Sequence, residues 1–403
     1  MSEPLIVIGN GMAAARFVEE LAKRTLGRYA VAVIGQEPRL AYNRVLLSAL
    51  LAEEVAFSDI ELKPARWWRD RGVTLHYGVR ATAVDPAARK VTLASGIALP
   101  FSKLVFATGS QPIKLGNPGM DLPGVLTFRD VDDVNTIAAC KGRRVVVIGG
   151  GLLGLEAAYG LAKAGARVTV LHLMDRLMER QLDPRAASML KRAVEAKGIA
   201  VRLEAQTARV IGTRRVEAVE LVDGTIVEAD AVVVAVGIRA NAELARGAGL
   251  AVERGIVVDD HLETGIAGVH AIGECAQHRG LCYGLVEPAY EQAQVLARRL
   301  AGENAVYPGS VLATNLKVSG VNVFSVGEFL GGGAGAEDVV LSDPGVGVYK
   351  KLTIAADRLI GAVLFGDTAD GPWYLDLIRS GSSIANLRDD LVFGRALATR
   401  VAA

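Results

Sequence analysis

The sequence predicts an α/β fold with two three-layer units built on parallel strands, followed by a small C-terminal α+β domain. Three observations support this. A β-branched run ends in glycines near the N-terminus, the same arrangement returns further along the chain, and the last ~90 residues change to strands separated by turns. A chain of 403 residues is also too long for one comfortable core, which favours two to three domains.

The first glycine motif, Gly-Asn-Gly-Met-Ala-Ala, follows the apolar run at residues 5–8 and fits the pattern G-x-G-x-x-A through Gly9, Gly11 and Ala14. The two glycines allow a tight turn and a close approach to a pyrophosphate, which the positive N-terminus of the next helix attracts. A second strand follows, and Glu37 just after it is the acid expected to hold the ribose hydroxyls, with its neighbour left open for that role. We predict a Rossmann-like dinucleotide-binding unit.

The second motif, Gly-Gly-Gly-Leu-Leu-Gly, follows another β-branched run and fits G-x-G-x-x-G through Gly149, Gly151 and Gly154. Two such motifs predict two dinucleotides. Where an acid would grip the ribose of NADH, after the second strand of this unit, the sequence has His172. His172 is either a ribose contact or a surface histidine whose hydrogen bonds are satisfied within the protein, and the choice between NADH and NADPH stays open.

Segments rich in proline and glycine indicate the domain boundaries. Residues 111–124 contain three prolines and three glycines, which suits a crossing between domains, and a similar seam follows the strand at residues 231–236. The predicted domains are residues 1–112 with 245–311 for the discontinuous first unit, 113–244 for the second unit, and 312–403 for the C-terminal domain.

Composition excludes several classes of partner. The 45 basic residues nearly balance the 44 acidic ones, so the net charge of +1 does not favour nucleic acid or an anionic membrane. The three cysteines show no metal-binding spacing, and no apolar run is long enough to span a bilayer. We therefore expect a cytoplasmic protein with no metal site.

Further motifs give the chain a family resemblance. The strand that ends at Thr108 and Gly109, the later strand that ends at Gly237, and the segment His-Ala-Ile-Gly-Glu at residues 270–274 together resemble the two-dinucleotide flavoproteins of the pyridine nucleotide-disulphide oxidoreductase superfamily. Within it, four segments look like the flavin part of NADH-dependent assimilatory nitrite reductase large subunits and the electron-transfer subunit of assimilatory nitrate reductase. These segments lie at residues 39–44, 150–156, 177–183, and 361–367 taken together with 371–374.

This resemblance, which covers essentially the whole chain, assigns FAD to the first unit and the nicotinamide coenzyme to the second. The implied FAD contacts are Gly9, Gly11, Ala14, Glu37, Arg44, the backbone of Ala81, Thr108, Gly109, Gly273, Glu274 and Glu287. The helix that begins at about Pro288 would direct its N-terminus at the O2 edge of the flavin. The implied contacts of the nicotinamide coenzyme are Gly149, Gly151, Leu153, Gly154, His172 and Gly237.

The chain also departs from the family pattern. Many relatives have a lysine after the Ser48 position, paired with the glutamate that Glu156 matches, but here Ala49 follows. The resemblance gives Glu156 a catalytic role in positioning the nicotinamide, and the alternative is a packing residue of the helix. Residues 42–48 contain no redox cysteine, so no thiol relay is expected. Cys275 and Cys282 form either a disulfide or inert thiols.

The function expected from the resemblance is that of an FAD-dependent NAD(P)H oxidoreductase that passes electrons from NADH through FAD to a separate acceptor in nitrite or nitrate assimilation. Nitrite reductase large subunits continue into cysteine-rich regions, which these 403 residues lack, so the expected partner is a reductase or an iron–sulfur protein. The sequence leaves open whether the protein forms a homodimer. One alternative is a rubredoxin or ferredoxin reductase of the same fold. Another is a non-catalytic FAD-binding redox sensor or assembly protein.

Overall fold

The computed structural model describes residues 2–25, 27–318, 320–331 and 333–399. The chain divides into two compact units. The first unit comprises Met1–Leu50, Val55–Ile113 and Ile238–Ser310, and the second comprises Leu51–Glu54, Lys114–Gly237 and Val311–Ala403. The predicted α/β class, with parallel sheets and a separate C-terminal sheet, is confirmed. The exact domain boundaries, including the one at residue 312, stay predictions.

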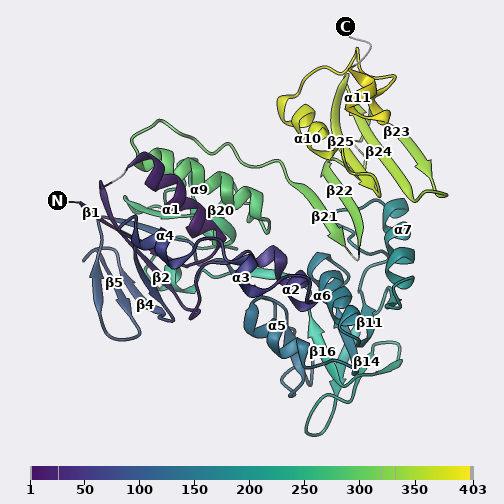
Figure 1. Cartoon of the computed structure of the whole chain (residues 1–403), viewed down its shortest axis with the longest axis horizontal. Coiled ribbons are helices and arrows are strands. Elements are labelled where there is room, and N and C mark those ends of the chain that lie inside the picture. The colour runs from purple at the N-terminus through teal and green to yellow at the C-terminus, as the bar shows by residue number, and fades with distance from the viewer. Residues whose placement is uncertain (1, 26, 319, 332, 400–403) are drawn as a thin grey trace. The chain divides into compact units, whose positions relative to one another are not determined.

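The first unit is built on a parallel five-stranded sheet with the strand order β19-β7-β1-β2-β3. Its strands are β1 (Glu3–Ile8), β2 (Tyr29–Gly35), β3 (Thr74–Tyr77), β7 (Lys103–Phe106) and β19 (Val269–Ala271). The central strand β1 has buried side chains in succession from Leu5 to Ile8, as expected for a parallel strand covered on both faces. The helices α1 (Met12–Arg24) and α9 (Val286–Leu300) lie side by side (Figure 1). Helix α9 begins two residues before Pro288.

Smaller elements complete this unit. An antiparallel sheet is formed by β4 (Ala81–Asp85), β5 (Lys90–Leu93) and β6 (Ala98–Pro100). The two predicted seams contain β8 (Ser110–Pro112) and β17 (Ile238–Ala240). These two strands pair antiparallel, so the two seams are hydrogen-bonded to each other. The remaining elements are β18 (Ile256–Val258), β20 (Ala276–His278), α3 (Phe57–Ile60), α4 (Ala65–Arg69), α8 (Glu243–Gly247), η1 (Arg44–Leu46) and η2 (Gly273–Cys275).

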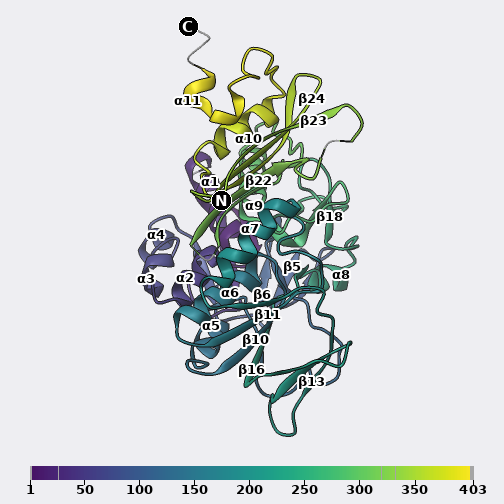
Figure 2. The same ribbon diagram turned by 90° about the vertical axis from the view of Figure 1, so that its right-hand side faces the viewer.

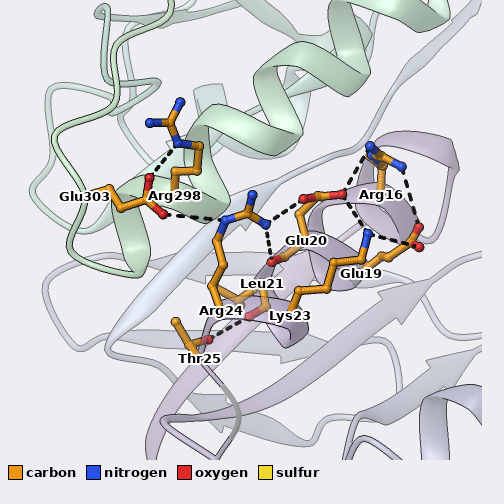
Figure 3. Close-up of polar contacts among 9 residues, drawn as sticks. All are labelled: Arg16, Glu19, Glu20, Leu21, Lys23, Arg24, Thr25, Arg298 and Glu303. Carbon is orange, nitrogen blue, oxygen red and sulfur yellow. Dashed lines mark hydrogen bonds and ion pairs between the residues drawn. The ribbon is translucent and has the colours of Figure 1, made fainter.

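A network of ion pairs runs along α1 and reaches the segment after α9 (Figure 3). Glu20 of α1 is 5% exposed, and its carboxylate contacts Arg16 at 3.1 Å, Lys23 at 3.0 Å and Arg24 at 2.6 Å. Arg24 also reaches Glu303, just beyond the end of α9, at 3.6 Å.

The second unit contains the other parallel sheet, with the strand order β12-β11-β10-β16-β9. Its strands are β9 (Val125–Thr127), β10 (Arg144–Ile148), β11 (Arg167–Leu171), β12 (Ala200–Arg202) and β16 (Ala231–Val234), and its helices are α5 (Val131–Ala138), α6 (Leu152–Lys163) and α7 (Pro184–Glu195). A three-stranded antiparallel sheet is formed by β13 (Thr207–Ile211), β14 (Ala218–Leu221) and β15 (Ile226–Glu228). At the end of α2 (Leu47–Leu51), Leu51 packs on Gly160 of α6, and Glu54 forms an ion pair with Lys163.

The C-terminal sheet, defined as β21 to β25, is antiparallel with the order β21-β22-β25-β24-β23, and Figure 2 shows its strands β22, β23 and β24. Its strands are β21 (Ala313–Val318), β22 (Val321–Gly327), β23 (Ala336–Asp343), β24 (Val348–Ala355) and β25 (Arg358–Phe365), followed by α10 (Gly371–Ser380), η3 (Leu391–Phe393) and α11 (Arg395–Ala398). The predicted change to strands separated by turns is confirmed in this part of the chain. Strand β23 is mostly exposed, so it lacks the apolar run by which a buried strand is recognised. No helix among the described residues is long and apolar enough to cross a membrane.

Candidate dinucleotide sites

The first glycine motif forms a tight loop at the end of β1, where the backbone passes close to the residue after the neighbouring strand β7. We call such a close passage a glycine crossing. Gly9 has φ +116°, and a Cβ atom at this position would lie 2.0 Å from the carbonyl oxygen of Ala107, which follows β7. Only glycine therefore permits this approach. Gly11 precedes α1, and nothing in the described residues lies within 4 Å of where its Cβ would be. The first turn of α1 thus has no side-chain cap, and the space beside Gly11 is open, which fits a pyrophosphate.

The second motif repeats this construction in the second unit. Gly149 has φ +122°, and its Cβ would lie 2.3 Å from the carbonyl oxygen of Ala235, just after β16. Gly151 precedes α6 and has the same open surroundings as Gly11 within the described part of the chain. Gly154 brings the first turn of α6 against the loop, because its Cβ would lie 2.0 Å from the oxygen of Gly149. The geometry of both motifs therefore fits a dinucleotide.

Two predicted FAD residues meet beyond β2. The carboxylate of Glu37 accepts a hydrogen bond from the hydroxyl of Tyr42 at 2.7 Å and forms an ion pair with Arg44. The guanidinium of Arg44 also lies over the ring of Tyr42, 5.0 Å from its centre. A ribose hydroxyl at Glu37 would share the carboxylate with these donors. The sequence analysis did not identify the role of Tyr42.

The segment around η2 lies between α1 and α9. Gly273 has φ +78°, and its Cβ would lie 3.0 Å from that of Ala13. The amide of Gly273 donates to Oε1 of Gln292, a fully buried residue of α9, at 2.7 Å. The next residue, Glu274, accepts a hydrogen bond from Ser110 at 2.8 Å. The sequence analysis missed Gln292, because an isolated glutamine in a helix has no recognisable pattern.

Thr108 and Gly109 are fixed by a residue far along the chain. The hydroxyl of Thr108 donates to the carbonyl oxygen of Asn241 at 2.6 Å, and the side chain of Asn241 donates to the carbonyl oxygen of Thr108 at 3.0 Å. The amide of Asn241 donates to the carbonyl oxygen of Gly109. Asn241 was also missed, and its place next to the second seam was the available signal.

The other predicted residues lie at the ends of elements. Ala14 is buried in the first turns of α1, Ala81 begins β4, and Leu153 lies half-buried in the first turn of α6. Gly237 lies between β16 and β17 with φ +123°. In the first turn of α9, Glu287 is exposed and Pro288 is buried.

His172 is buried rather than on the surface, although its hydrogen bonds are satisfied within the protein as in the alternative prediction. Its side chain follows β11 and is 7% exposed. Nδ1 accepts a hydrogen bond from the amide of Gly150 at 3.0 Å, and Nε2 lies 3.1 Å from a carboxylate oxygen of Glu179. A ribose contact, as predicted for His172, would have to displace one of these bonds.

Glu156 lies half-buried on α6, and burial raises the pKa of its carboxyl group to about 7. A carboxyl group of this kind can hold or release a proton near neutral pH. Its catalytic role stays a prediction.

The cysteines are free thiols, so Cys275 and Cys282 do not form the alternative disulfide. Cys275 is buried, and burial raises the pKa of its thiol, whereas Cys282 is exposed. Elevated thiol pKa values do not favour nucleophilic chemistry. Across the described ranges, no group of three or more His, Cys, Asp or Glu residues is placed to hold a metal ion.

Known proteins resemble the chain over nearly its whole length. Residues 3–297 match the family described as pyridine nucleotide-disulphide oxidoreductase, and residues 313–382 match the rubredoxin NAD+ reductase C-terminal domain. A nitrite reductase [NAD(P)H] of Bacillus subtilis (strain 168) is 42% identical over 94% of this chain and 48% of its own length. The assimilatory nitrate reductase electron transfer subunit of the same organism is 37% identical over 96% of this chain and 51% of its own length.

The chain thus spans about half the length of these two relatives. Among solved structures, the ferredoxin reductase of Rhodopseudomonas palustris is 28% identical, with a TM-score of 0.86, over 97% of this chain and 100% of that one.

Proposed function

This chain belongs to the pyridine nucleotide-disulphide oxidoreductase family, and we propose that it is the electron-input part of a system that assimilates nitrite or nitrate. It is an FAD-dependent NAD(P)H oxidoreductase. In the proposal, electrons from NADH pass through FAD to a separate acceptor, which is a reductase or an iron–sulfur protein. A cytoplasmic location fits the free thiols.

The observation that carries the proposal is the pair of glycine crossings, one in each unit. We assign the FAD pyrophosphate to Gly9, Gly11 and the start of α1, and the nicotinamide coenzyme to Gly149, Gly151 and the start of α6. Bound FAD supplies the redox chemistry, because it takes a hydride from a nicotinamide and can release the electrons singly. The protein supplies binding and orientation.

The other predicted residues have proposed roles around these crossings. Glu37 and Arg44 would hold the ribose end of FAD, and Glu274 would hold its ribityl chain. Glu156 is proposed to position the nicotinamide without the lysine that many relatives have, since Ala49 stands in its place. The raised pKa of Glu156 supports a role in a site that excludes water.

A second candidate function is that of a rubredoxin or ferredoxin reductase. It is favoured by residues 313–382, which match the C-terminal domain of rubredoxin NAD+ reductase, and by the likeness to a solved ferredoxin reductase. The two candidates share the input half of the reaction and differ in the acceptor.

The test begins with the purified protein and its bound flavin. We expect NADH to bleach the FAD absorbance without oxygen, and the reduced protein to reduce a nitrite or nitrate reductase faster than it reduces rubredoxin or ferredoxin. As a matched control, Gly149→Ala should keep FAD but lose reduction by NADH, because its Cβ would collide with Ala235.

Faster transfer to rubredoxin or ferredoxin would support the second candidate. Bleaching without turnover on any acceptor would favour a redox sensor. A protein without FAD, or one that NADH does not reduce, would refute the proposal.

A further inference from the structure

The two glycine crossings differ in which residue carries the side chain. In the first unit β1 pairs with β2 so that Ile8 lies opposite Ile34, and in the second β10 pairs with β11 so that Ile148 lies opposite Leu171. The residue that follows Ile34 is Gly35, and the residue that follows Leu171 is His172. These two residues are therefore structural counterparts.

Their neighbours in the glycine loops are exchanged as well. In the first unit the loop residue is Asn10, and a Cβ on Gly35 would lie 2.6 Å from the Cβ of Asn10. In the second unit the loop residue is Gly150, whose Cβ would lie 2.6 Å from Cγ of His172. The bulky side chain thus comes from the loop in the first unit and from the strand end in the second.

In the second unit this exchange fixes the loop by hydrogen bonds. The amide of Gly150 donates to Nδ1 of His172, and the carbonyl oxygen of Gly150 accepts a hydrogen bond from the amide of Met178 at 3.0 Å. Residues 172 and 178 therefore hold both polar groups of the residue between Gly149 and Gly151. The loop conformation that presents the start of α6 depends on these bonds.

The Gly150 amide and the Glu179 carboxylate together determine which nitrogen of His172 carries the proton. Because Nδ1 accepts from an amide, it must be unprotonated, and the proton of the neutral ring is on Nε2. There it is donated to Glu179, whose carboxylate lies 3.1 Å away. A carboxylate that holds one ring nitrogen sets the tautomer and orientation of the imidazole.

We propose that His172 and Glu179 are positioning residues that shape the pyrophosphate loop of the nicotinamide coenzyme, and that His172 does not read the ribose. The inference rests on the proposed function of the second unit. It implies that the pair acts equally on NADH and NADPH, because both coenzymes carry the same pyrophosphate.

The sequence around β11 supports this separation of roles. In the first unit the acid assigned to the ribose, Glu37, lies two residues beyond Gly35. The same step beyond His172 leads to Met174, which is 44% exposed and carries no carboxylate. Neither His172 nor Met174 therefore offers an acid that would favour the 2′-hydroxyl of NADH over the 2′-phosphate of NADPH.

Three variants test the pair. His172→Phe keeps a ring but removes the acceptor, His172→Asn keeps an acceptor oxygen one bond from Cγ, where Nδ1 stands, and Glu179→Leu removes the carboxylate. Binding of NAD+, NADP+, ADP-ribose and 2′-phospho-ADP-ribose to the oxidised, FAD-loaded protein would be measured by calorimetry. Hydrogen exchange at the Gly150 amide gives a readout independent of ligand.

We expect His172→Phe to raise the Kd of all four ligands about tenfold or more and by the same factor, since it leaves a buried amide without its acceptor. His172→Asn should stay near the wild type, and Glu179→Leu should fall between them. Exchange at Gly150 should speed up in His172→Phe but not in His172→Asn.

A tenfold change in the ratio of the Kd values for NAD+ and NADP+ in His172→Phe would show that His172 contacts the ribose. This result alone would overturn the inference. Unchanged binding in both His172→Phe and Glu179→Leu would also overturn it. A wild-type protein that binds none of the four ligands would refute the proposed function, and the inference with it. If His172→Phe does not fold, Glu179→Leu alone decides. A tenfold change in its ratio of Kd values for NAD+ and NADP+, or unchanged binding, would overturn the inference.

Discussion

Glu156 links burial to the pH dependence of folding. Burial raises the pKa of its carboxyl group from 4.5 to about 7. The folded protein therefore holds this proton more tightly than the unfolded chain, and the resulting stability is complete below pH 4.5 and lost as the pH rises through about 7. Glu156→Gln removes the titration. Between pH 5 and pH 8 we expect the free energy of unfolding of the wild type to fall relative to that of the variant by ~2 to 3 kcal/mol.

Urea unfolding at the two pH values measures this difference. Glu303→Gln, which changes an exposed carboxylate, is the control and should follow the wild type. If the difference in unfolding free energy between the wild type and Glu156→Gln is the same at pH 5 and pH 8, Glu156 is solvated and its pKa is ordinary.

The residues of the candidate sites differ in how far the sequence predicts them. Gly9 and Gly149 were predictable, because the need for a positive φ and for room against a neighbouring strand is written in a local pattern. Gln292 and Asn241 act through contacts with Gly273 and Thr108, which lie far away in the sequence. No local pattern encodes such a contact.

Helix α1 depends on a carboxylate that the fold almost hides from water. Burial acts to raise the pKa of Glu20, but hydrogen bonds from Arg24 and Lys23 and the charge of Arg16 outweigh it and lower the pKa. Glu20→Gln would leave three cations around a neutral side chain. We expect the free energy of unfolding at pH 7 to fall by ~1 to 3 kcal/mol.

Thermal or urea unfolding of the FAD-loaded protein measures the effect. Because the pKa of Glu20 is lowered in the folded state, its contribution is present above pH 4.5 and lost at lower pH, so the variant and the wild type should converge in acid. Glu303→Gln removes a carboxylate at the outer edge of the same network and should cost at most ~1 kcal/mol. Equal losses in the two variants would contradict the special place of Glu20.

Among the elements, periodicity predicted best those that are buried on both sides. Strands β1 and β10 are continuous apolar runs, so both glycine loops were placed correctly. Strand β23 alternates weakly and faces solvent, and β8 and β17 are three-residue strands in proline- and glycine-rich segments. Their pairing depends on partners that composition does not reveal.

At the scale of the whole molecule, the sequence analysis identified two dinucleotide units from an internal repeat, and the family match agrees with it. It did not anticipate that Leu51–Glu54 belongs to the second unit, where Leu51 packs on Gly160. This association has no sequence signal, because a short apolar segment does not specify its partner. Nor did it anticipate how the C-terminal sheet is attached within that unit.

That attachment includes a buried hydrogen bond between Tyr349 of β24 and Asp183. The hydroxyl of Tyr349 donates to one carboxylate oxygen of Asp183 at 2.6 Å, and the other oxygen caps α7 through the amide of Ala186 at 3.0 Å. Tyr349 is 3% exposed and Asp183 is 6% exposed. Burial and the Asp183 carboxylate both raise the pKa of Tyr349, so the hydroxyl keeps its proton and remains the donor.

Tyr349→Phe would leave a buried carboxylate oxygen without its donor, and we expect it to cost ~1 to 3 kcal/mol of unfolding free energy. Hydrogen exchange shows where the loss occurs. It should speed up in β24 and also in the first turn of α7, since Asp183 serves both. The matched control is Tyr374→Phe, because the hydroxyl of Tyr374 donates to Leu391 within the C-terminal domain at 2.8 Å and should affect exchange in that domain alone. If Tyr349→Phe leaves α7 unchanged, Asp183 caps the helix independently of the C-terminal sheet, and the two parts are not coupled through this bond.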